Sequence, residues 1–402
     1  MARVHSPARL LSAVRRERRA LSQLVAETGG KHVPFGERGS GHYSAATKGC
    51  FDVIARCQGP ALAALDRVFG ARRRAGVVGS PFNLADFGTA DGGTSLPLFR
   101  VLVHAIRAEE PSSPIVVAYE DQAQNDWQSV FHMTQGTLPN GPPGYLDGSV
   151  DNVYVVASGT SFYNQCFAPG SIDFAFSATA MHWLTQLPAD IPDALHSACT
   201  EDPAARDAFA AQAATDWRQI MLMRARELRP GGQMVIANFA KDTHGRFLGQ
   251  SFPRVKESMH HTFSELWREV AGPEVYRATN FPNEYRSLEA CAAPFESAAG
   301  PVRAAGLRLI AAETALVECP FHTEWVQSGG DAAAYAARFV PTTRTWSNST
   351  FVSGAVKAGV PDHEAVAMTD EMFAQYTARV AAAPADHAMD YVHSYVQVAK
   401  QD

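Results

Sequence analysis

The sequence predicts an α/β protein with a doubly wound, mostly parallel sheet at its core and a helical cap in its later part. Two observations predict the core. Short apolar runs alternate with stretches of helical periodicity, and a glycine-rich turn joins the first run to the first helix. A third observation predicts the cap, because after Phe239 the periodicity becomes mainly helical. Strand, glycine turn, helix and strand in this order form a βαβ unit, the building block of a parallel sheet.

Short apolar runs bounded by Gly, Pro or Asp are the expected strands. They are Pro81 to Phe87, Ile115 to Tyr119, Val153 to Ala157, Ile172 to Phe176, Met234 to Phe239 and Leu307 to Leu316. One helix is expected between the first two runs, over Leu96 to Arg107, and another over Ala211 to Leu228. Proline and glycine in Arg229-Pro-Gly-Gly232 end the second helix.

The remaining segments are expected to cap the carboxyl edge of the sheet, where open α/β sheets bind ligands. Residues 241–300 mix polar loops with helical pieces. The stretch from Asp331 to Lys400 is Ala-rich and helical in pattern, with breaks at Pro341, Pro361 and Pro384. The expected organisation is an N-terminal helical arm over residues 1–40, a core over residues 41–240 and 301–325, and a cap over residues 241–300 and 326–402.

Length and charge favour a protein that binds a small molecule. The chain has 402 residues, and 35 basic against 41 acidic side chains give a formal charge of −6. Because phosphate binding needs a clustered basic surface, nucleic acid is not expected as a partner. The longest apolar runs have about five residues, whereas a membrane-spanning helix needs roughly 18. No membrane span is therefore expected.

Cysteine, histidine and arginine usage indicates a cytoplasmic protein without a metal. The 6 cysteines contain no CxxC pair and the 14 histidines no HExxH motif, so neither a disulfide framework nor a metal site is expected. The first 19 residues carry six arginines but only a Leu10-Leu11 pair as an apolar nucleus. A secretory signal needs a longer apolar core, so a basic amphipathic arm is favoured and a transit peptide is the alternative.

The end of the first strand and the end of the second form a candidate ligand site. The segment Asp86-Phe-Gly-Thr-Ala-Asp-Gly-Gly-Thr94 has small residues that let a ligand approach the backbone. Glu120-Asp121 places acids where ribose hydroxyls are bound in such folds. A nucleoside-containing cofactor follows, with a plain structural turn and solvated loop acids as the alternative. A nicotinamide dehydrogenase is disfavoured because GxGxxG is absent.

Further motifs occur in a fixed order along the chain. The central ones are Ser158-Gly-Thr-Ser-Phe-Tyr163, Phe167-Ala-Pro-Gly-Ser171, Ser177-Ala-Thr-Ala-Met-His-Trp183-Leu and Gln186-Leu-Pro188. Around them lie Gly41-His-Tyr-Ser44, Asp86 to Thr94, Asp121 to Gln128, Arg226-Glu-Leu-Arg-Pro-Gly-Gly232, Met234-Val-Ile and Phe281-Pro-Asn-Glu-Tyr285. Together they resemble the SABATH carboxyl methyltransferases, a family that uses S-adenosylmethionine. The resemblance runs from about Gly41 into the C-terminal helices and covers most of the chain.

The resemblance implies a Rossmann-like methyltransferase fold, a homodimer and a defined cofactor site. It places S-adenosylmethionine, and the product S-adenosylhomocysteine, against Tyr43, Asp86, Gly88, Asp121, Gln122, Ser161, Phe162 and Ser177. In these roles Asp121 would grip the ribose diol, Phe162 would stack on the adenine and Ser161 would hydrogen-bond near it. Asp86 and the Gly88 turn would hold the aminoacyl end. Trp183 would donate its indole N–H to the substrate carboxylate.

The substrate side departs from the family pattern at several positions. Cys50 stands where the family has a glutamine that donates to the carboxylate, and a thiol replaces that donor poorly. Either Lys48 or an amide from elsewhere takes the role, or the carboxylate sits differently. Thr94 replaces an asparagine of the first motif, and Thr179 replaces an aromatic residue, which would open space beside the methyl acceptor. A medium-chain fatty acid is therefore favoured, as in bacterial relatives, and Ala- and Arg-rich usage is typical of GC-rich bacterial genomes.

The expected reaction is methyl transfer to the carboxylate of a small hydrophobic acid. A carboxylic acid is already ionised at neutral pH, so no general base is needed and positioning dominates. Benzoate, salicylate and indole-3-acetate are the next candidates after fatty acids. Two alternatives remain open. His182 could serve as the base of an N- or phenol O-methyltransferase, although it could equally only shape the pocket. The chain could also bind ligands without turnover.

Overall fold

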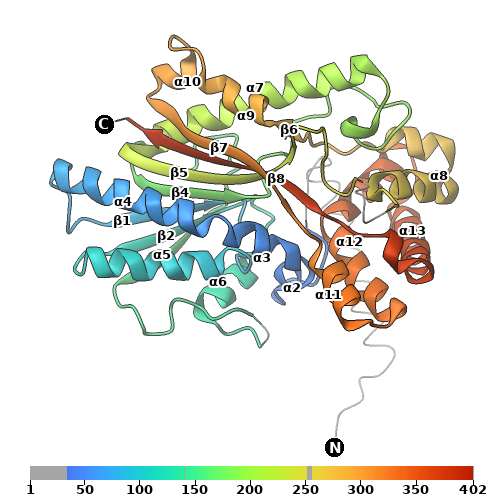
Figure 1. Cartoon of the computed structure of the whole chain (residues 1–402), viewed down its shortest axis with the longest axis horizontal. Coiled ribbons are helices and arrows are strands. Elements are labelled where there is room, and N and C mark those ends of the chain that lie inside the picture. Colours follow the sequence, from blue (N-terminus) through green and yellow to red (C-terminus); the bar gives the residue numbers. More distant parts are fainter. Residues whose placement is uncertain (1–33, 140, 251–255, 402) are drawn as a thin grey trace, which may run out of the picture.

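The computed structural model describes residues 34–139, 141–250 and 256–401, so residues 1–33 of the expected N-terminal arm lie outside it. A twisted sheet lies between helices, and further helices stand against one end of it (Figure 1). The main path of the sheet has the order β3-β2-β1-β4-β5-β8-β7. The strands are β1 (Phe82–Phe87), β2 (Ile115–Glu120), β3 (Val153–Ser158), β4 (Ile172–Ala178), β5 (Leu228–Lys241), β6 (Arg286–Ser287), β7 (Leu307–Val317) and β8 (Tyr391–Lys400).

The predicted doubly wound sheet is confirmed, with all six expected runs present as strands. Strands β1 to β5 pair in parallel, whereas β8 is antiparallel to both β5 and β7. β1 lies between β2 and β4. Strands β2 and β3 therefore lie on one side of β1, and the later strands of the sheet lie on its other side. This switch point is where open α/β sheets bind ligands outside the carboxyl ends of their strands.

Helices cover both faces of the sheet (Figure 1). Leu84 on β1 packs in one apolar core with Val68 and Val103, while its neighbour Ala85 packs with Trp217 and Ile220 in the other. This alternation follows from the period of two in a strand. The first face carries α4 (Gln58–Ala75), α5 (Leu96–Glu109) and α6 (Trp127–Gln135), and the second α7 (Pro203–Glu227), α9 (Leu288–Ala292) and α10 (Pro301–Ala304).

The cap is helical, as predicted, but its last part differs from the expectation. Its helices are α8 (Met259–Ala278), α11 (Pro320–Ser328), α12 (Ala332–Lys357) and α13 (Asp362–Ala382), joined by α2 (His42–Ala46) and α3 (Lys48–Ala55) from the N-terminal side; the short helices are η1 (Ser197–Cys199), η2 (Ala293–Phe295) and η3 (Pro384–Asp386). Pro341 lies inside α12 and does not break it. Pro361 caps the start of α13 and Pro384 begins η3.

The expectation of cap structure up to residue 402 is wrong at its end, because residues 391–400 form β8 in the middle of the sheet. The segment is rich in β-branched and aromatic residues, and the neighbours Tyr395 and Val396, whose side chains point to opposite faces, are 5% and 1% exposed. Such residues favour a strand buried on both faces. The Ala-rich helical pattern of α12 and α13 ends before this segment and does not extend over it.

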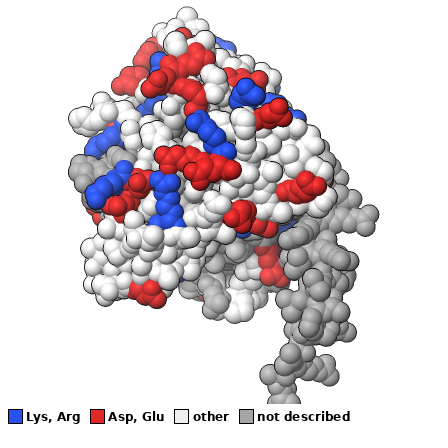
Figure 2. Space-filling model, turned by 90° about the vertical axis from the view of Figure 1, so that its right-hand side faces the viewer, with Lys and Arg blue, Asp and Glu red and all other residues white. Residues whose placement is uncertain are grey.

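The charge of the cap surface and the apolar character of the helices indicate which kinds of partner to expect. On the face of the cap shown in Figure 2, basic and acidic side chains of the described residues are interspersed. Within the described part of the chain, no helix has the length and apolar character needed to cross a membrane.

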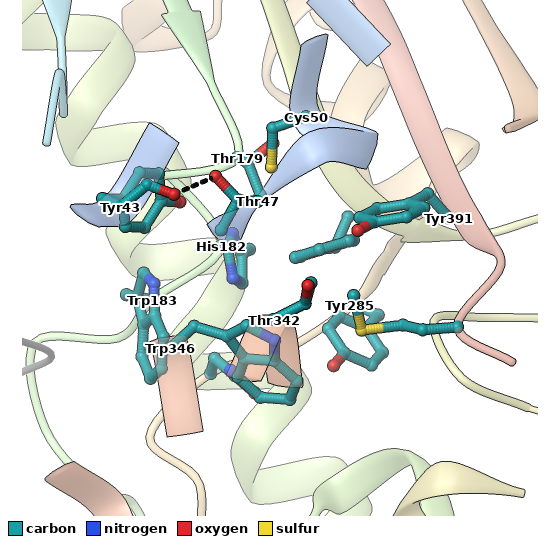
Figure 3. A pocket seen from close by; sticks show the side chains of 13 residues that line it. Tyr43, Thr47, Cys50, Thr179, His182, Trp183, Tyr285, Thr342, Trp346 and Tyr391 are labelled. Carbon is teal, nitrogen blue, oxygen red and sulfur yellow. Dashed lines mark hydrogen bonds between the residues drawn. The ribbon is translucent and has the colours of Figure 1, made fainter. Parts of the chain in front are cut away.

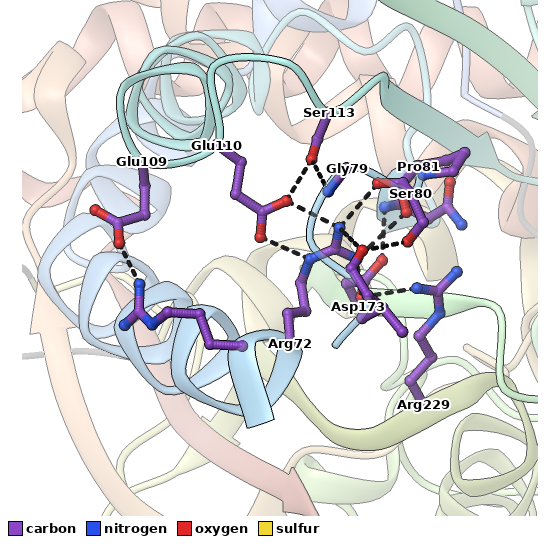
Figure 4. A network of polar contacts seen from close by, with 12 residues as sticks. Arg72, Gly79, Ser80, Pro81, Glu109, Glu110, Ser113, Asp173 and Arg229 are labelled. Atoms are coloured by element: carbon purple, nitrogen blue, oxygen red, sulfur yellow. Dashed lines mark hydrogen bonds and ion pairs between the residues drawn. The ribbon is translucent and has the colours of Figure 1, made fainter. Parts of the chain in front are cut away.

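A buried network fixes the amino ends of β1 and β4 (Figure 4). Arg72 of α4 donates to Glu110 (Nε to Oε1, 2.8 Å) and to Asp173 at the start of β4 (Nη1 to Oδ1, 2.9 Å). Its Nη2 also donates to the backbone oxygen of Ser80 (2.9 Å). Arg72, Glu110 and Asp173 are each at most 3% exposed. The network lies at the end of the sheet opposite to the candidate site and serves the fold.

Candidate functional site

The turn after β1 requires a glycine at its first position. Gly88 has a φ of 71°, and a Cβ on it would lie 2.2 Å from the Cβ of Ala180. Beneath the turn, Asp86 accepts hydrogen bonds from Thr89 Oγ1 (3.1 Å) and Ser95 Oγ (2.6 Å). Burial raises the pKa of Asp86 to about 7, although these two hydroxyls act to lower it. Asp86 therefore braces the turn from beneath.

Two acids at the end of β2 face this turn from the neighbouring strand. Gly88 N donates to the backbone oxygen of Glu120 (2.8 Å) and to its Oε2 (3.2 Å), and Ala90 N donates to Asp121 Oδ2 (2.8 Å). Burial raises the pKa of Glu120 well above its ordinary value. Burial also raises the pKa of Asp121 to about 6, although the N–H groups of Ala90 and Gln122 act to lower it. The second Glu120 oxygen, Oε1, has no hydrogen-bond partner among the described residues.

The segment before α3 is tied to the same turn. Ser44 of α2 donates from its backbone nitrogen to Asp91 Oδ2 (2.8 Å) and from its hydroxyl to the other oxygen of that carboxylate. Gly41 N donates to Ser129 Oγ of α6 (3.0 Å). These contacts position α2, and with it Tyr43, at the carboxyl end of the sheet.

The loop after β3 supplies an aromatic wall. The rings of Phe162 and Tyr163 lie 4.7 Å apart. The backbone oxygen of Phe162 accepts a hydrogen bond from Arg224 Nη1 of α7 (2.9 Å), and Arg224 in turn pairs with Glu227 (Nε to Oε2, 2.6 Å). Arg224 is fully buried, so this loop is anchored to the sheet's helical layer from beneath.

These parts enclose a large cavity of about 790 Å³, which is in the size range of small-molecule sites. Six of the eight predicted cofactor residues line it, namely Tyr43, Gly88, Asp121, Gln122, Ser161 and Phe162. Asp86 and Ser177 do not line it. Ser177 is fully buried and donates to the backbone oxygen of Phe87 (2.9 Å), so it joins β4 to β1 behind the cavity. Glu120, which the sequence placed with Asp121 where ribose hydroxyls are bound, lines the cavity as well.

The loop that carries Trp183 follows β4 and is held on both sides. Met181 N donates to Asn238 Oδ1 (3.0 Å), and its backbone oxygen accepts from Arg286 Nη1 (2.7 Å). The hydroxyl of Tyr163 donates to the backbone oxygen of Trp183. Because each of these partners belongs to a different element, the loop has little freedom to shift.

A second, smaller cavity adjoins Trp183 (Figure 3). The space that the centres of water-sized molecules can occupy is about 20 Å³, which is room for roughly one water. The wall consists mainly of aromatic side chains and is made of Tyr43, Thr47, Cys50, Thr179, His182, Trp183, Phe239, Asn283, Tyr285, Thr342, Trp346, Met389 and Tyr391. Tyr43, Thr179 and Trp183 line both cavities. The two cavities therefore share one wall.

Cys50 stands at the position of the family glutamine, and Lys48 was proposed to take over its role; the two residues differ in their surroundings. Cys50 is 6% exposed and lines the small cavity, and burial raises the pKa of its thiol to about 12, so it is a neutral group there. Lys48 lines neither cavity and instead forms an ion pair with Glu324 of α11. In the structure Glu324 holds the ammonium group of Lys48 and Lys48 borders neither cavity, so a role of Lys48 toward the substrate stays a prediction.

Thr179 lines both cavities, so this residue borders the free space of each. Its hydroxyl lies 3.1 Å from His393 Nε2 of β8, so the side chain turns toward the sheet. Thr179 also has a φ of 57°, an uncommon conformation for a β-branched residue. His182 lines the small cavity, and its ring lies 5.4 Å from that of Trp183 and 5.0 Å from that of Phe239.

Several wall residues of the small cavity were not found from the sequence. Asn283, Tyr285, Trp346 and Tyr391 come from the cap and from β8, where the pattern gave neither register nor direction. Phe281-Pro-Asn-Glu-Tyr285 was recognised as a motif but given no role. Among the residues that the structure describes, no group of three or more His, Cys, Asp or Glu side chains is arranged to hold a metal ion.

Comparison with known proteins agrees with the resemblance found in the motifs. The model of the SAM dependent carboxyl methyltransferase family matches residues 73–272. An O-methyltransferase of Aspergillus aculeatus is 31% identical over 163 residues, which cover 39% of this chain and 39% of the relative. The jasmonate O-methyltransferase of Arabidopsis thaliana is 26% identical over 246 residues, which cover 54% of this chain and 59% of the relative. The chain thus matches less than two thirds of the length of either relative.

The fold has a counterpart among solved structures. Loganic acid methyltransferase with SAH superimposes with a TM-score of 0.69 at 17% identity, over 92% of this chain and 99% of that chain. At this identity the likeness concerns the fold. Residues 73–272 therefore match the family of S-adenosylmethionine-dependent carboxyl methyltransferases, and the described chain has the Rossmann-like fold of a methyltransferase.

Proposed function

We propose that this protein transfers the methyl group of S-adenosylmethionine to the carboxylate of a small hydrophobic acid. The bond between sulfur and the methyl carbon breaks, a bond between carboxylate oxygen and that carbon forms, and the products are a neutral methyl ester and S-adenosylhomocysteine. The observation that carries the proposal is the wall shared by the two cavities, formed by Tyr43, Thr179 and Trp183. A donor in the large cavity and an acceptor in the small one would meet there.

The large cavity fits the cofactor by its chemistry. Asp121 supplies a carboxylate for the ribose diol, and Phe162 supplies a flat face for the adenine. The Gly88 turn brings backbone close to the ligand, where any Cβ would clash with Ala180. Glu120 adds a buried carboxylate with one oxygen that has no described partner. Hydrogen-bond acceptors at these positions suit S-adenosylmethionine, which carries hydroxyl and amino donors and a positively charged sulfonium group.

The small cavity would act on the acid by positioning it and not by supplying a general base. The bound cofactor supplies an electrophilic methyl group, and an ionised carboxylate attacks it without a base. Trp183 would orient the carboxylate through its indole N–H, and its loop is fixed through Met181 and Tyr163. Holding the acid in line would contribute much of the rate, up to about 7 to 11 kcal/mol in model reactions. Cys50 would contact the acid as a neutral, weak donor.

The acid itself, the quaternary state and the location extend this proposal. A medium-chain fatty acid stays the favoured substrate on the residue pattern, followed by benzoate, salicylate and indole-3-acetate, and an acid of that size enters only if the wall of the small cavity moves. Relatives include proteins named for jasmonate, loganic acid and indole-3-acetate. We infer a homodimer, a cytoplasmic location and a bacterial source from the resemblance and composition alone.

A methyl-transfer assay with labelled S-adenosylmethionine tests the proposal. The panel holds C6 to C14 fatty acids, benzoate, salicylate, indole-3-acetate and matched amines and phenols. Turnover confined to the acids, and a loss of about 10²-fold or more in kcat/KM in Trp183→Phe, is expected. Transfer only to amines or phenols would replace the carboxyl assignment with the N- or phenol O-methyltransferase. Cofactor binding without transfer to any acceptor would leave a binding protein.

A further inference from the structure

Besides the amide of Asn283, two aromatic polar groups in the wall of the small cavity are buried without hydrogen-bond partners among the described residues. They are the indole Nε1 of Trp346, from α12, and the hydroxyl of Tyr391, at the start of β8. Trp346 is 9% exposed and Tyr391 1% exposed. Buried polar groups are nearly always hydrogen-bonded, so two such groups on one cavity wall need an explanation.

The packing around both rings holds the polar ends at the cavity. The Trp346 ring lies 5.7 Å from that of Phe281 and 6.3 Å from that of Phe263, which fix it from the cap side. The Tyr391 ring stacks on Phe239 at 6.1 Å. Gly49 of α3 makes room for it, because a Cβ there would lie 2.5 Å from the Tyr391 hydroxyl. Figure 3 shows both rings in the wall of the cavity.

Two other buried aromatic residues of the cap, Trp267 and Tyr335, satisfy their polar atoms within the protein. Trp267 is fully buried, and its Nε1 donates to Thr279 Oγ1 (3.0 Å). The hydroxyl of Tyr335 donates to the backbone oxygen of His387 (2.7 Å). Neither Trp267 nor Tyr335 lines the small cavity. By contrast, Trp346 and Tyr391 present their unpartnered donors to the cavity in which a substrate would bind.

We infer that the acid carries a second oxygen, a carbonyl or a hydroxyl remote from its carboxylate, which accepts hydrogen bonds from Trp346 and Tyr391. The inference rests on the proposed methyl transfer to an acid. Trp346 and Tyr391 line only the small cavity, whereas Trp183 lines both cavities. The carboxylate therefore lies at the shared wall and the second oxygen farther in. A neutral oxygen suits these partners because an indole N–H is a donor only and a phenol can donate as well.

Matched acids that differ by one oxygen test this inference. The pairs are octanoate with its oxo- and hydroxy-octanoates, cyclohexanecarboxylate with its 4-oxo derivative, and benzoate with the hydroxybenzoates. A site that hydrogen-bonds an oxygen rejects the analogue that lacks it, because its donors are then left unpaired. For the best pair we expect the oxygenated acid to be ahead in kcat/KM by roughly 5- to 150-fold.

Variants connect that preference to the two donors. Trp346→Phe and Tyr391→Phe remove one donor each and keep a ring, so each is expected to lower the preference at least several-fold and the double variant to abolish it. Because neither donor is paired in the free protein, thermal stability should be kept. Trp267→Phe and Tyr335→Phe are the controls, since they lose satisfied hydrogen bonds outside the cavity and should lower stability without changing the preference.

The outcomes separate this inference from the proposed function. If no acid is methylated, the proposed function itself fails. If acids are methylated but every matched pair reacts equally, or if the plain fatty acid is ahead, only the second oxygen is excluded. A preference that survives unchanged in the double variant would assign the recognition of that oxygen to other residues and overturn the role of Trp346 and Tyr391.

Discussion

The two ends of the parallel sheet bury acidic side chains in opposite ways. At the amino ends of the strands, Glu110 and Asp173 share the guanidinium of Arg72. At the carboxyl ends, Asp86 and Glu120 are equally buried, at 2% and 0% exposed, yet neither pairs with a basic side chain in the described part of the chain. The buried acids at the amino ends therefore have a basic partner without any ligand, whereas, within the described residues, those at the carboxyl ends do not.

The pKa directions express the same difference. Burial acts to raise the pKa of Glu110, but its hydrogen bonds with Arg72 and Ser113 outweigh burial, and the pKa is lowered. For Glu120 burial prevails and the pKa is raised well above its ordinary value. A buried acid without a partner costs free energy, and such groups cluster at functional sites. The comparison indicates that the first end serves stability and that the second is kept for a ligand.

The largest expected effect comes from removing the basic partner at the amino ends of the strands. Arg72→Met leaves Glu110 buried without its cation and Asp173 with Arg229 alone (Nη1 to Oδ1, 3.5 Å), and removing one partner of a buried pair costs about 3 to 5 kcal/mol. Urea unfolding at pH 7.5 measures this loss. Arg73→Met is the matched control, because Arg73 and Glu109 form an exposed ion pair that is worth about 0 to 1 kcal/mol. Similar losses in the two variants would contradict the stabilising role of the buried network.

A smaller effect of a different kind is expected at the carboxyl ends of the strands. Asp121→Asn keeps the size of the side chain and one acceptor but removes the charge that would hold the ribose. A hydrogen bond to a charged group contributes about 1.5 to 3 kcal/mol, so affinity for S-adenosylhomocysteine should fall roughly 10- to 150-fold. Calorimetry at pH 7.5 measures this affinity. Unchanged affinity, with a large loss of unfolding free energy, would make Asp121 a structural residue like those of the Arg72 network.

The sheet was predictable from sequence because its strands leave a strong local signal. β1 and β4 are buried along nearly their whole length, so each reads as a short run dominated by apolar residues, with few polar exceptions. β8 gave the same kind of signal at Val392 to Val398, but it follows two long Ala-rich helices and pairs with segments over 70 residues away. Its pairing is a tertiary fact that local pattern does not contain.

The cofactor side of the site was more predictable than the substrate side for a physical reason. Gly88, Asp121 and Phe162 sit on short turns directly after strands, so their position follows from the strand assignment. Trp346 lies in the middle of a 26-residue helix and Tyr391 on an unpredicted strand. The direction of Lys48 depended on Glu324, 276 residues away, and no local pattern reveals such a partner.

The pH dependence of stability sharpens the comparison further. Burial raises the pKa of Asp86 to about 7 from an unfolded value of 3.8, so its contribution is present below pH 3.8 and is lost as pH rises through 7. Asp86→Asn should therefore be more stable than the wild type at pH 8, by on the order of 1 kcal/mol, with little difference at pH 4. Unfolding at both pH values measures this, and a destabilised variant at pH 8 would show that the carboxylate is satisfied.

Burial of histidines acts in the opposite direction and sets the acid limit. Burial lowers the pKa of His260 and of His393 to about 3, from 6.5. Their contribution to stability is therefore present above pH 6.5 and is lost as pH falls toward 3. The Asp86 comparison is best made against this background, with wild type and variant measured at each pH so that the histidine contribution cancels.

The smallest effect is a fraction of a proton released on cofactor binding. At pH 6.5 Asp86 and Asp121, with pKa values of about 7 and 6, are partly protonated in the free protein. A ligand that supplies donors and positive charge lowers both pKa values, so protons leave. Titration of S-adenosylmethionine in two buffers of different ionisation enthalpy measures the release, which should be smaller in Asp86→Asn and Asp121→Asn. At pH 8.5 both acids are already ionised and this difference from the wild type should vanish. Equal release by all three proteins at pH 6.5 would mean that cofactor binding does not change the protonation of these acids, and the contrast between the two ends of the sheet would lose its functional meaning.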